Sequence, residues 1–353
     1  MYSGLKSQGM KIERKMSMDQ KRGKQSICFE NPPYIISRAS IAGIKEGQGP
    51  LGKRIDVISN DDMFGMKSWE EAESEMQRQT VELVLEKSKC SKEDIRYIFA
   101  GDLLGQLIAT SFGIMDYEIP LFGLYGACST MGESIALGAM TVNAGYADNV
   151  IALASSHFAS AEKQFRFPLE YGNQRPLSTT WTVTGCGAVI VSNQPSSVRI
   201  AGITTGKIID YGIKDSMNMG AAMAPAAADL IYQNFCDFQV DETYYDMIIT
   251  GDLGTIGKRI LIDLLNDKGY DISSRHTDCG IEIFNQEEQD THAGGSGCGC
   301  SAVTLCSYII DNIIDKKWKR VLFLPTGALL STVSYNEGKS VPGIAHGVIF
   351  ESC

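Results

Sequence analysis

The sequence predicts an α/β fold built from two pseudo-duplicated α/β halves. Short runs rich in β-branched residues alternate with longer helical patterns from residue 33 to the end of the chain. In addition, the segment IFAGDL at 98–103 returns as IITGDL at 248–253, and each copy ends a predicted strand and precedes a predicted helix. We therefore expect a site where the two halves meet, at the carboxyl ends of strands.

The first half, residues 33–195, alternates predicted strands with predicted helices. Ser68 is placed to cap a helix, because acidic residues follow it in the first turn and an amphipathic pattern continues from there. The predicted strands cover 34–41, 95–100, 120–125, 150–155 and 187–192, and the predicted helices cover 68–87, 103–112 and the residues after Cys128 to about 144.

The second half, residues 196–353, repeats this scheme. Its alanine-rich helix is the expected counterpart of the helix at Ser68, and the helix after Gly297 is the expected counterpart of the helix after Cys128. The predicted strands cover 198–204, 247–250, 320–324 and 345–350, and the predicted helices cover 217–235, 255–265 and 296–314.

Composition excludes several classes of protein. The 353 residues are 44% hydrophobic and 21% charged, which is typical of a globular protein with a large core. The formal net charge of -10 argues against broad binding of nucleic acid, because the summed field repels phosphate. Ten cysteines without a disulfide-scaffold pattern or a signal peptide predict a cytoplasmic fold, and no apolar run has the ~20 residues that span a membrane.

The N-terminal residues 1–32 are predicted to form a basic, flexible arm. Within residues 1–24, seven lysines and arginines stand against Glu13 and Asp19, and there is no clear helical stripe. Such an arm is either a flexible start without a function or a segment that touches an anionic membrane surface or a partner.

Cys128 is the strongest site candidate. It lies in the segment LYGACSTMGES, between a predicted strand and a predicted helix. The N–H groups and the dipole at a helix start stabilise a thiolate and any oxyanion formed beside it. The alternative is small-residue packing at a strand-to-helix turn, and the local pattern leaves both interpretations open.

Several motifs together resemble the thiolase and ketoacyl-synthase superfamily over residues 33–353. They are GACST around Cys128, TGCGAVIVS at 184–192, THAGGSGCGCS at 291–301 and PGIAHGVIF at 342–350. Within this superfamily, SSHFASAEKQFRFPLEYGNQRPLSTTWTVTG at 155–185 resembles the stage V sporulation protein AD family of endospore-forming bacteria.

The resemblance implies a thiolase-like, layered αβαβα architecture and a homodimer. It also implies non-catalytic binding of dipicolinic acid, with calcium, for uptake into the developing spore, and no cofactor. Its implied partners are the other stage V sporulation A proteins at the inner spore membrane, where the protein would act peripherally without a transmembrane segment.

The catalytic set of the superfamily is incomplete in this chain. Where ketoacyl synthases carry a histidine, the resemblance places Thr250-Gly251-Asp252, and where they carry histidine-glycine-asparagine it places His292-Ala293-Gly294-Gly295. Acyl transfer by cysteine needs a base and an oxyanion hole within hydrogen-bond reach of the thiol. We therefore favour binding over turnover. The alternative is a cysteine-dependent acyltransferase or condensing enzyme acting on a coenzyme A or carrier-protein thioester.

Dipicolinate carries two carboxylates on a flat ring, so its site should offer cationic or N–H donors and apolar planes. The segment from His157 to Arg175 concentrates donors and aromatic residues in an otherwise acidic chain. Arginine binds both oxygens of a carboxylate, so Arg166 and Arg175 lead the candidates. The alternatives are a solvated loop or a dimer contact. The full set of predicted ligand-binding residues is Cys128, His157, Lys163, Arg166, Arg175, His292 and His346. No metal site is predicted, because one Cys-x-Cys pair at 298–300 is a weak signal.

Overall fold

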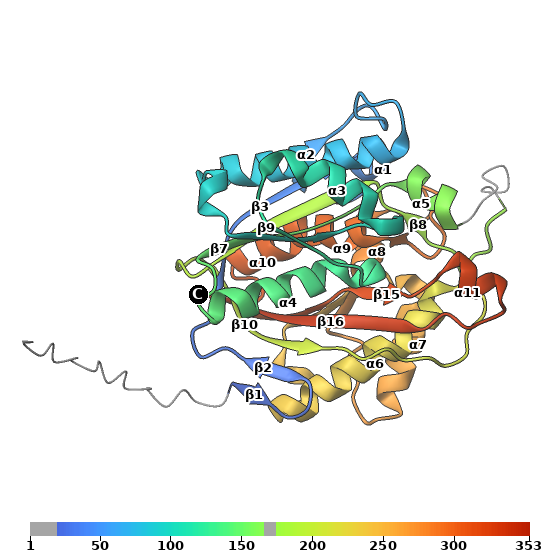
Figure 1. The fold of residues 1–353 in the computed structure, drawn as a ribbon. Helices are drawn as coiled ribbons and strands as arrows, with labels where there is room; N and C mark the ends of the chain where they lie inside the picture. The colour runs from blue at the N-terminus through green and yellow to red at the C-terminus, as the bar shows by residue number, and fades with distance from the viewer. Residues whose placement is uncertain (1–19, 166–173) are drawn as a thin grey trace, which may run out of the picture.

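The computed structural model describes residues 20–165 and 174–353, and these form five layers of alternating helices and strands (Figure 1). The strands of the two β layers belong to one continuous hydrogen-bonded sheet of 14 strands among the described residues. The predicted αβαβα architecture is confirmed.

The first-half strands follow the order β3-β9-β7-β5-β6. The pairs β3 with β9 and β9 with β7 are antiparallel, whereas β7 with β5 and β5 with β6 are parallel. Strand β6 is one of the two ends of the sheet. The bounds are β3 (Tyr34–Ala42), β5 (Tyr97–Gly101), β6 (Leu121–Gly123), β7 (Asn149–Ser156) and β9 (Gly185–Ser192).

The second-half strands repeat this pattern in the order β10-β16-β14-β11-β12. Two antiparallel pairs are again followed by two parallel pairs. The two halves join where Arg199 of β10 pairs with Tyr34 of β3. The bounds are β10 (Val198–Thr205), β11 (Met247–Thr250), β12 (His276–Asp278), β14 (Arg320–Leu324) and β16 (Gly343–Ser352). The repeated GDL segments therefore follow equivalent strands, β5 and β11, which confirms the predicted duplication.

Helices cover the outer faces of the sheets and fill the space between them (Figure 1). A capping box between Ser68 and Glu71 begins α2, as predicted. The outer helices are α2 (Trp69–Ser88), α3 (Ile108–Ile114), α6 (Met219–Phe238) and α7 (Gly254–Asn266), and the central helices are α4 (Thr130–Asn143) and α9 (Cys298–Thr304). Helix α9 continues through a π-helical turn, Leu305–Ile309, into α10 (Ile310–Ile314), so the predicted helix over 296–314 is confirmed.

Short elements at the strand ends complete the fold. Strand β8 (Trp181–Thr182) pairs with β13 (Gly295–Ser296) in a separate two-stranded sheet, and β15 (Thr326–Ala328) pairs with β16. The remaining elements are α1 (Ile44–Gly47), β4 (Val57–Ile58), α5 (Phe158–Phe165), α8 (Cys279–Ile283) and α11 (Thr332–Asn336).

Two strands within residues 20–32 join the sheet, which corrects the prediction of a flexible arm over this stretch. Strands β1 (Lys21–Arg22) and β2 (Ser26–Cys28) form a hairpin, and β2 pairs with β10 of the second half. Asp237 of α6 fixes the hairpin, because its carboxylate accepts the backbone N–H groups of Lys24 and Gln25, each at 2.9 Å. Residues 1–19 of the predicted arm lie outside the described residues.

The central helices carry the largest part of the core. Met131, Ile135 and Ala139 of α4 are fully buried, as are Val303 of α9 and Leu305 of the π-helical turn. These side chains meet the inner faces of both β layers, so α4 and α9 pack against each other in the centre of the fold. In residues 20–165 and 174–353, no helix combines the length and apolar character required to cross a membrane.

Candidate ligand-binding site

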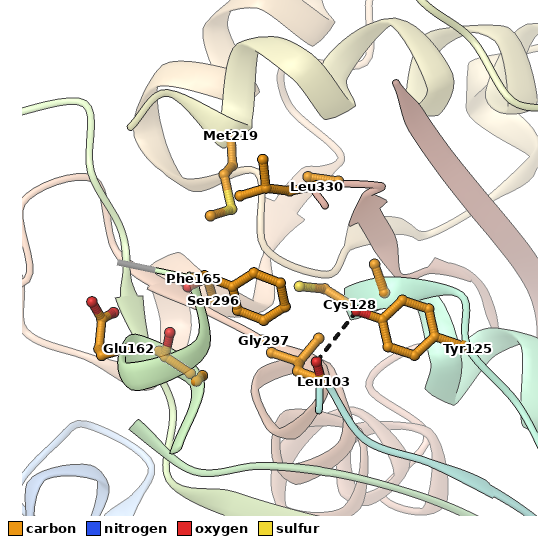
Figure 2. Close-up of a pocket in the computed structure, with 13 residues that line it drawn as sticks. Leu103, Tyr125, Cys128, Glu162, Phe165, Met219, Ser296, Gly297 and Leu330 are labelled. Atoms are coloured by element: carbon orange, nitrogen blue, oxygen red, sulfur yellow. Dashed lines mark hydrogen bonds between the residues drawn. The ribbon is translucent and has the colours of Figure 1, made fainter. Parts of the chain in front are cut away.

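A small cavity of about 40 Å³ opens beside Cys128, where both halves contribute strand ends and helix starts. Figure 2 shows the Cys128 sulfur pointing toward the ring of Phe165, with Met219 and Leu330 across the cavity. The walls are largely apolar, and the lining residues with polar side chains are Tyr125, Cys128, Glu162, Thr182 and Ser296. The cavity therefore lies between the halves, where the sequence leads us to expect a site.

The turn that carries Cys128 is fixed by local hydrogen bonds. Ala127 adopts a left-handed conformation with φ of 49°. The hydroxyl groups of Ser129 and Thr130 donate to the carbonyls of Gly126 and Ala127 at 2.6 and 2.7 Å. The backbone of Gly327 packs against this turn so closely that a Cβ there would lie 2.3 Å from the Gly126 carbonyl oxygen. The position of Cys128 is therefore set by both halves of the chain.

The electrostatics at Cys128 contradict the prediction of a stabilised thiolate. Burial raises the pKa of the Cys128 thiol well above its usual value, and the neighbouring carboxyl of Asp252 raises it further. A hydrogen bond from the Gly297 N–H acts in the opposite direction and does not compensate. The helix start is present as predicted, but desolvation and the adjacent acid outweigh it.

Asp252 is the site residue that sequence reasoning missed. Its side chain is buried after β11, and its carboxyl accepts the N–H of Gly297 at 3.0 Å and the hydroxyl of Thr326 at 2.9 Å. The charge of Asp252 acts on the Cys128 thiol and raises its pKa. Burial raises the pKa of Asp252 to about 7. The repeated GDL segment was the signal for this residue, because each copy places an aspartate at a strand end.

The two predicted histidines of the second half do not line the cavity. Both nitrogens of His292 are engaged, Nδ1 with the Pro176 carbonyl at 3.0 Å and Nε2 with the Asp290 carboxylate at 3.1 Å. His346 is buried on β16, and burial lowers its pKa to about 4. Neither imidazole is therefore placed as a base beside Cys128.

His157 and Lys163 face other cavities. The Ala159 N–H donates to Nδ1 of His157, so Nε2 carries the proton and donates to the Asp62 carbonyl at 2.8 Å. The Lys163 ammonium lies 2.7 Å from Glu70, in a groove between α2 and α3. These two predicted donors are therefore not brought together with Cys128.

Arg175 is held by an aromatic and ionic cluster outside the cavity lining. Its guanidinium lies 2.8 Å from the Asp290 carboxylate and 4.9 Å from the centre of the Trp181 ring. Phe158 stacks on Trp181 with ring centroids 4.0 Å apart. The prediction for Arg166 lies outside the described residues.

In the described ranges, 20–165 and 174–353, no group of three or more His, Cys, Asp or Glu side chains is arranged to hold a metal ion. The thiols of the Cys-x-Cys pair form hydrogen bonds inside the core. Cys298 donates to the Ala127 carbonyl at 3.0 Å, and Cys300 donates to the Gly251 carbonyl at 3.5 Å.

The comparison with known proteins decides the family. A family profile described as stage V sporulation protein AD matches residues 23–351. The chain is also 43% identical over 329 residues to the stage V sporulation protein AD of Bacillus subtilis (strain 168), covering 93% of this chain and 97% of that protein. This chain belongs to the stage V sporulation protein AD family.

Solved structures confirm the thiolase-like fold of this family member. The 3-oxoacyl-[acyl-carrier-protein] synthase III from Aquifex aeolicus VF5 superposes with a TM-score of 0.56 at 13% identity, covering 90% of this chain and 99% of that chain. The Acat5 thiolase from Ascaris suum in complex with coenzyme A superposes with a TM-score of 0.54 at 10% identity, covering 94% and 100%. At these identities the likeness concerns the fold alone.

Proposed function

We propose that this protein binds dipicolinate, carried with calcium, in the Cys128 cavity, and that it serves uptake of dipicolinate into the developing spore without catalysing a reaction. Membership of the stage V sporulation protein AD family supports the role in sporulation. The single observation that supports binding over turnover is the burial of Cys128, which raises the pKa of its thiol, in a cavity whose described lining holds no histidine.

The cavity suits a small flat ligand with acidic groups. Phe165, Met219 and Leu330 offer apolar surfaces on which a ring can lie. The starts of α4 and α9 meet at the floor, and the positive ends of their dipoles favour a carboxylate there. The hydroxyl groups of Thr182 and Ser296 add polar contacts.

Calcium fits the charge of the cavity. Glu162 is the one carboxylate in the described lining, which contains no lysine or arginine. A calcium complex of dipicolinate carries less negative charge than the free dianion, so a described lining without a lysine or arginine opposes it less. Calcium takes six to eight oxygen ligands, and the dipicolinate carboxylates would supply part of that shell.

The same cavity is also the place where an acyltransferase would act, because Cys128 occupies the floor of a thiolase-like fold. That second function requires an activated thiol. The raised pKa of Cys128 and the absence of an imidazole from the described lining weigh against it.

A calorimetric titration with calcium dipicolinate, and separately with dipicolinate alone, tests the proposal. We expect saturable binding that is tighter with calcium. Cys128→Phe, which fills the cavity, should abolish binding, and Cys236→Phe should retain it because Cys236 is exposed on α6. Absence of binding at millimolar ligand would exclude the proposal. Acylation of Cys128 by a thioester, detected by mass spectrometry, would support the acyltransferase instead.

We further propose that the protein acts as a homodimer, with other stage V sporulation A proteins at the inner spore membrane. Strand β6 ends the sheet, and its three residues are all exposed. The outer edge of a terminal strand has no partner strand, and with exposed apolar side chains it is a site for pairing with another chain. Exposed apolar residues on β6 and in the segments that precede and follow it in the sequence are Ile108, Phe112, Met115, Leu121, Phe122 and Tyr125.

A further inference from the structure

A second cavity, of about 420 Å³, lies in the first half of the chain. It is bounded by α1, the start of α2, the start of α5 and β8, and Figure 1 shows α1, α5 and β8 close together. A cavity of about 150 Å³ is enough to hold benzene inside a protein, so this one has room for a substituted ring. Its described lining shares no residue with the lining of the Cys128 cavity.

Three aromatic side chains line this second cavity: Trp69, Phe158 and Trp181. Phe158 and Trp181 stack with their ring centroids 4.0 Å apart and their planes 10° from parallel. Trp69 is half-buried, and within the described residues no other ring stacks on it and no cation lies over it. The cavity therefore offers flat apolar surfaces that suit a planar ring.

Lys45 supplies the positive charge of the lining. Its ammonium lies 4.2 Å from the centre of the Trp181 ring and donates to the Gln289 carbonyl at 2.6 Å. An ammonium has three N–H donors, and no carboxylate in the described part of the chain forms an ion pair with Lys45. Burial lowers the pKa of Lys45. An anionic group that enters the cavity would therefore meet a half-buried cation with open donors.

The other titratable groups of the described lining are Glu46, Asp62 and His157. Glu46 is buried, and its carboxyl accepts the Thr184 N–H at 3.0 Å. Burial raises the pKa of Glu46 to about 7, so it carries only part of a negative charge at neutral pH. Asp62 is exposed, so water and salt screen its charge. Burial lowers the pKa of His157, which keeps its ring neutral. These groups therefore oppose an anion only weakly.

We propose that this cavity is a second binding site, which takes a small aromatic carboxylate. The acid binds the Lys45 ammonium, and the ring lies against Trp69 and Phe158. This inference goes beyond the proposed function, because it concerns a different place in the fold and a class of ligands of which dipicolinate is only one member.

The test is a titration of the full chain with benzoate, followed by calorimetry and by tryptophan fluorescence. Two of the three tryptophans line the cavity, whereas Trp318 packs against Tyr308. Benzamide keeps the ring without the charge, and cyclohexanecarboxylate keeps the charge without the flat ring. We expect saturable binding of benzoate with a change in tryptophan emission. Both analogues should bind about tenfold more weakly, because each lacks one of the two contacts.

Two substitutions remove one contact each. Lys45→Met and Trp69→Ala should each weaken benzoate binding about tenfold, and Lys45→Arg should restore most of the affinity because it keeps the charge. Trp69→Ala keeps the test valid if Lys45→Met disturbs the contact with Gln289. Lys53→Met, at an exposed lysine, and Trp318→Phe are the controls and should bind benzoate as the wild type does.

Cys128→Phe separates the two cavities. The fluorescence change with benzoate should persist in this variant, and its loss would assign the ligand to the Cys128 cavity and overturn the proposal. The proposal is also overturned if the wild type does not bind benzoate at millimolar concentration, or if Lys45→Met and Trp69→Ala both keep the wild-type affinity. None of these results contradicts binding of dipicolinate at Cys128, so the two proposals can fail separately.

Discussion

Ser155 donates a hydrogen bond of 2.7 Å to the buried carboxyl of Glu73, across the interface between α2 and the end of β7. Gln77 extends this contact, because its amide donates to Ser155 at 2.7 Å and to Thr110 at 3.1 Å, and Thr110 donates to Asp102 at 2.6 Å. Two buried acids are thus connected by one chain of hydrogen bonds. Burial raises the pKa of Glu73 to about 8, and the charge of Asp102 adds to the effect.

This arrangement predicts that stability falls as pH rises. The folded chain keeps a proton on Glu73 up to pH about 8, whereas the unfolded chain releases it near its ordinary pKa of 4.5. Between these values the folded state binds more protons, so the free energy of unfolding decreases by up to about 1.4 kcal/mol per pH unit from this group. The contribution is complete below pH 4.5 and lost above pH 8.

Glu73→Gln should therefore flatten the decline, as measured by urea unfolding at pH 5, 6.5 and 8. Glu86→Gln, at an exposed position on the same helix, should leave the pH dependence unchanged. An equal slope in the Glu73→Gln variant and the wild type would contradict the prediction.

Because β6 is an exposed edge strand, we expect a charged side chain placed on it to prevent dimer formation. Phe122 is 49% exposed on the terminal strand of the sheet, so an arginine there would have to be desolvated in a dimer. Phe122→Arg should convert a dimer into a monomer in sedimentation equilibrium at micromolar concentration. Ile208→Arg, at a position 62% exposed in the second half, should remain dimeric. A wild-type chain that sediments as a monomer would refute this prediction.

The Asp237 contacts predict that the N-terminal hairpin depends on one side chain. Asp237→Ala leaves the N–H groups of Lys24 and Gln25 without their acceptor, which should cost about 2 kcal/mol of stability. Hydrogen exchange of the amides from 20 to 28 should become faster while exchange in α4 stays slow. Asp267→Ala, at an exposed position, is the control. Unchanged exchange in the hairpin would count against the role of Asp237.

We expect replacement of Arg175 to destabilise the folded chain rather than to remove a direct contact with the ligand. Its side chain is 9% exposed and holds both Asp290 and Trp181. Arg175→Ala should lower the free energy of unfolding by about 1–2 kcal/mol, because it removes a cation–π contact and a buried aliphatic stem, whereas the ion pair with the exposed Asp290 contributes little. Arg259→Ala, which alters an exposed arginine on α7, should have little effect. If Arg175→Ala folds as stably as the wild type but binds dipicolinate more weakly, direct contact with the ligand becomes the better explanation.

The elements were predictable because their signals are local. The capping box at Ser68 begins α2 at the expected residue, and the GDL repeat marks the equivalent strands β5 and β11. The hairpin at 20–28 was missed because its short strands are basic and carry little hydrophobic pattern. Its pairing partner, β10, lies in the other half of the chain, and so does Asp237.

The candidate site was predictable only in part. Cys128 was found because a cysteine at a strand-to-helix turn is a local pattern, and the turn is present. The segment after β7 concentrates donors in the sequence, but the structure directs His157 to Asp62 and Lys163 to Glu70. Sequence proximity does not specify which cavity a side chain faces.

By itself, the sequence determined the duplicated α/β order, the family resemblance and the place of Cys128 at a helix start. Only the tertiary structure decided the chemical state of that cysteine. The pKa of a thiol depends on its burial and on nearby charges. Here the burial results from packing between the two halves, and the nearby charge is that of Asp252. Periodicity and capping signals act over a few residues, whereas this packing forms only when the starts of α4 and α9 and the end of β11 meet.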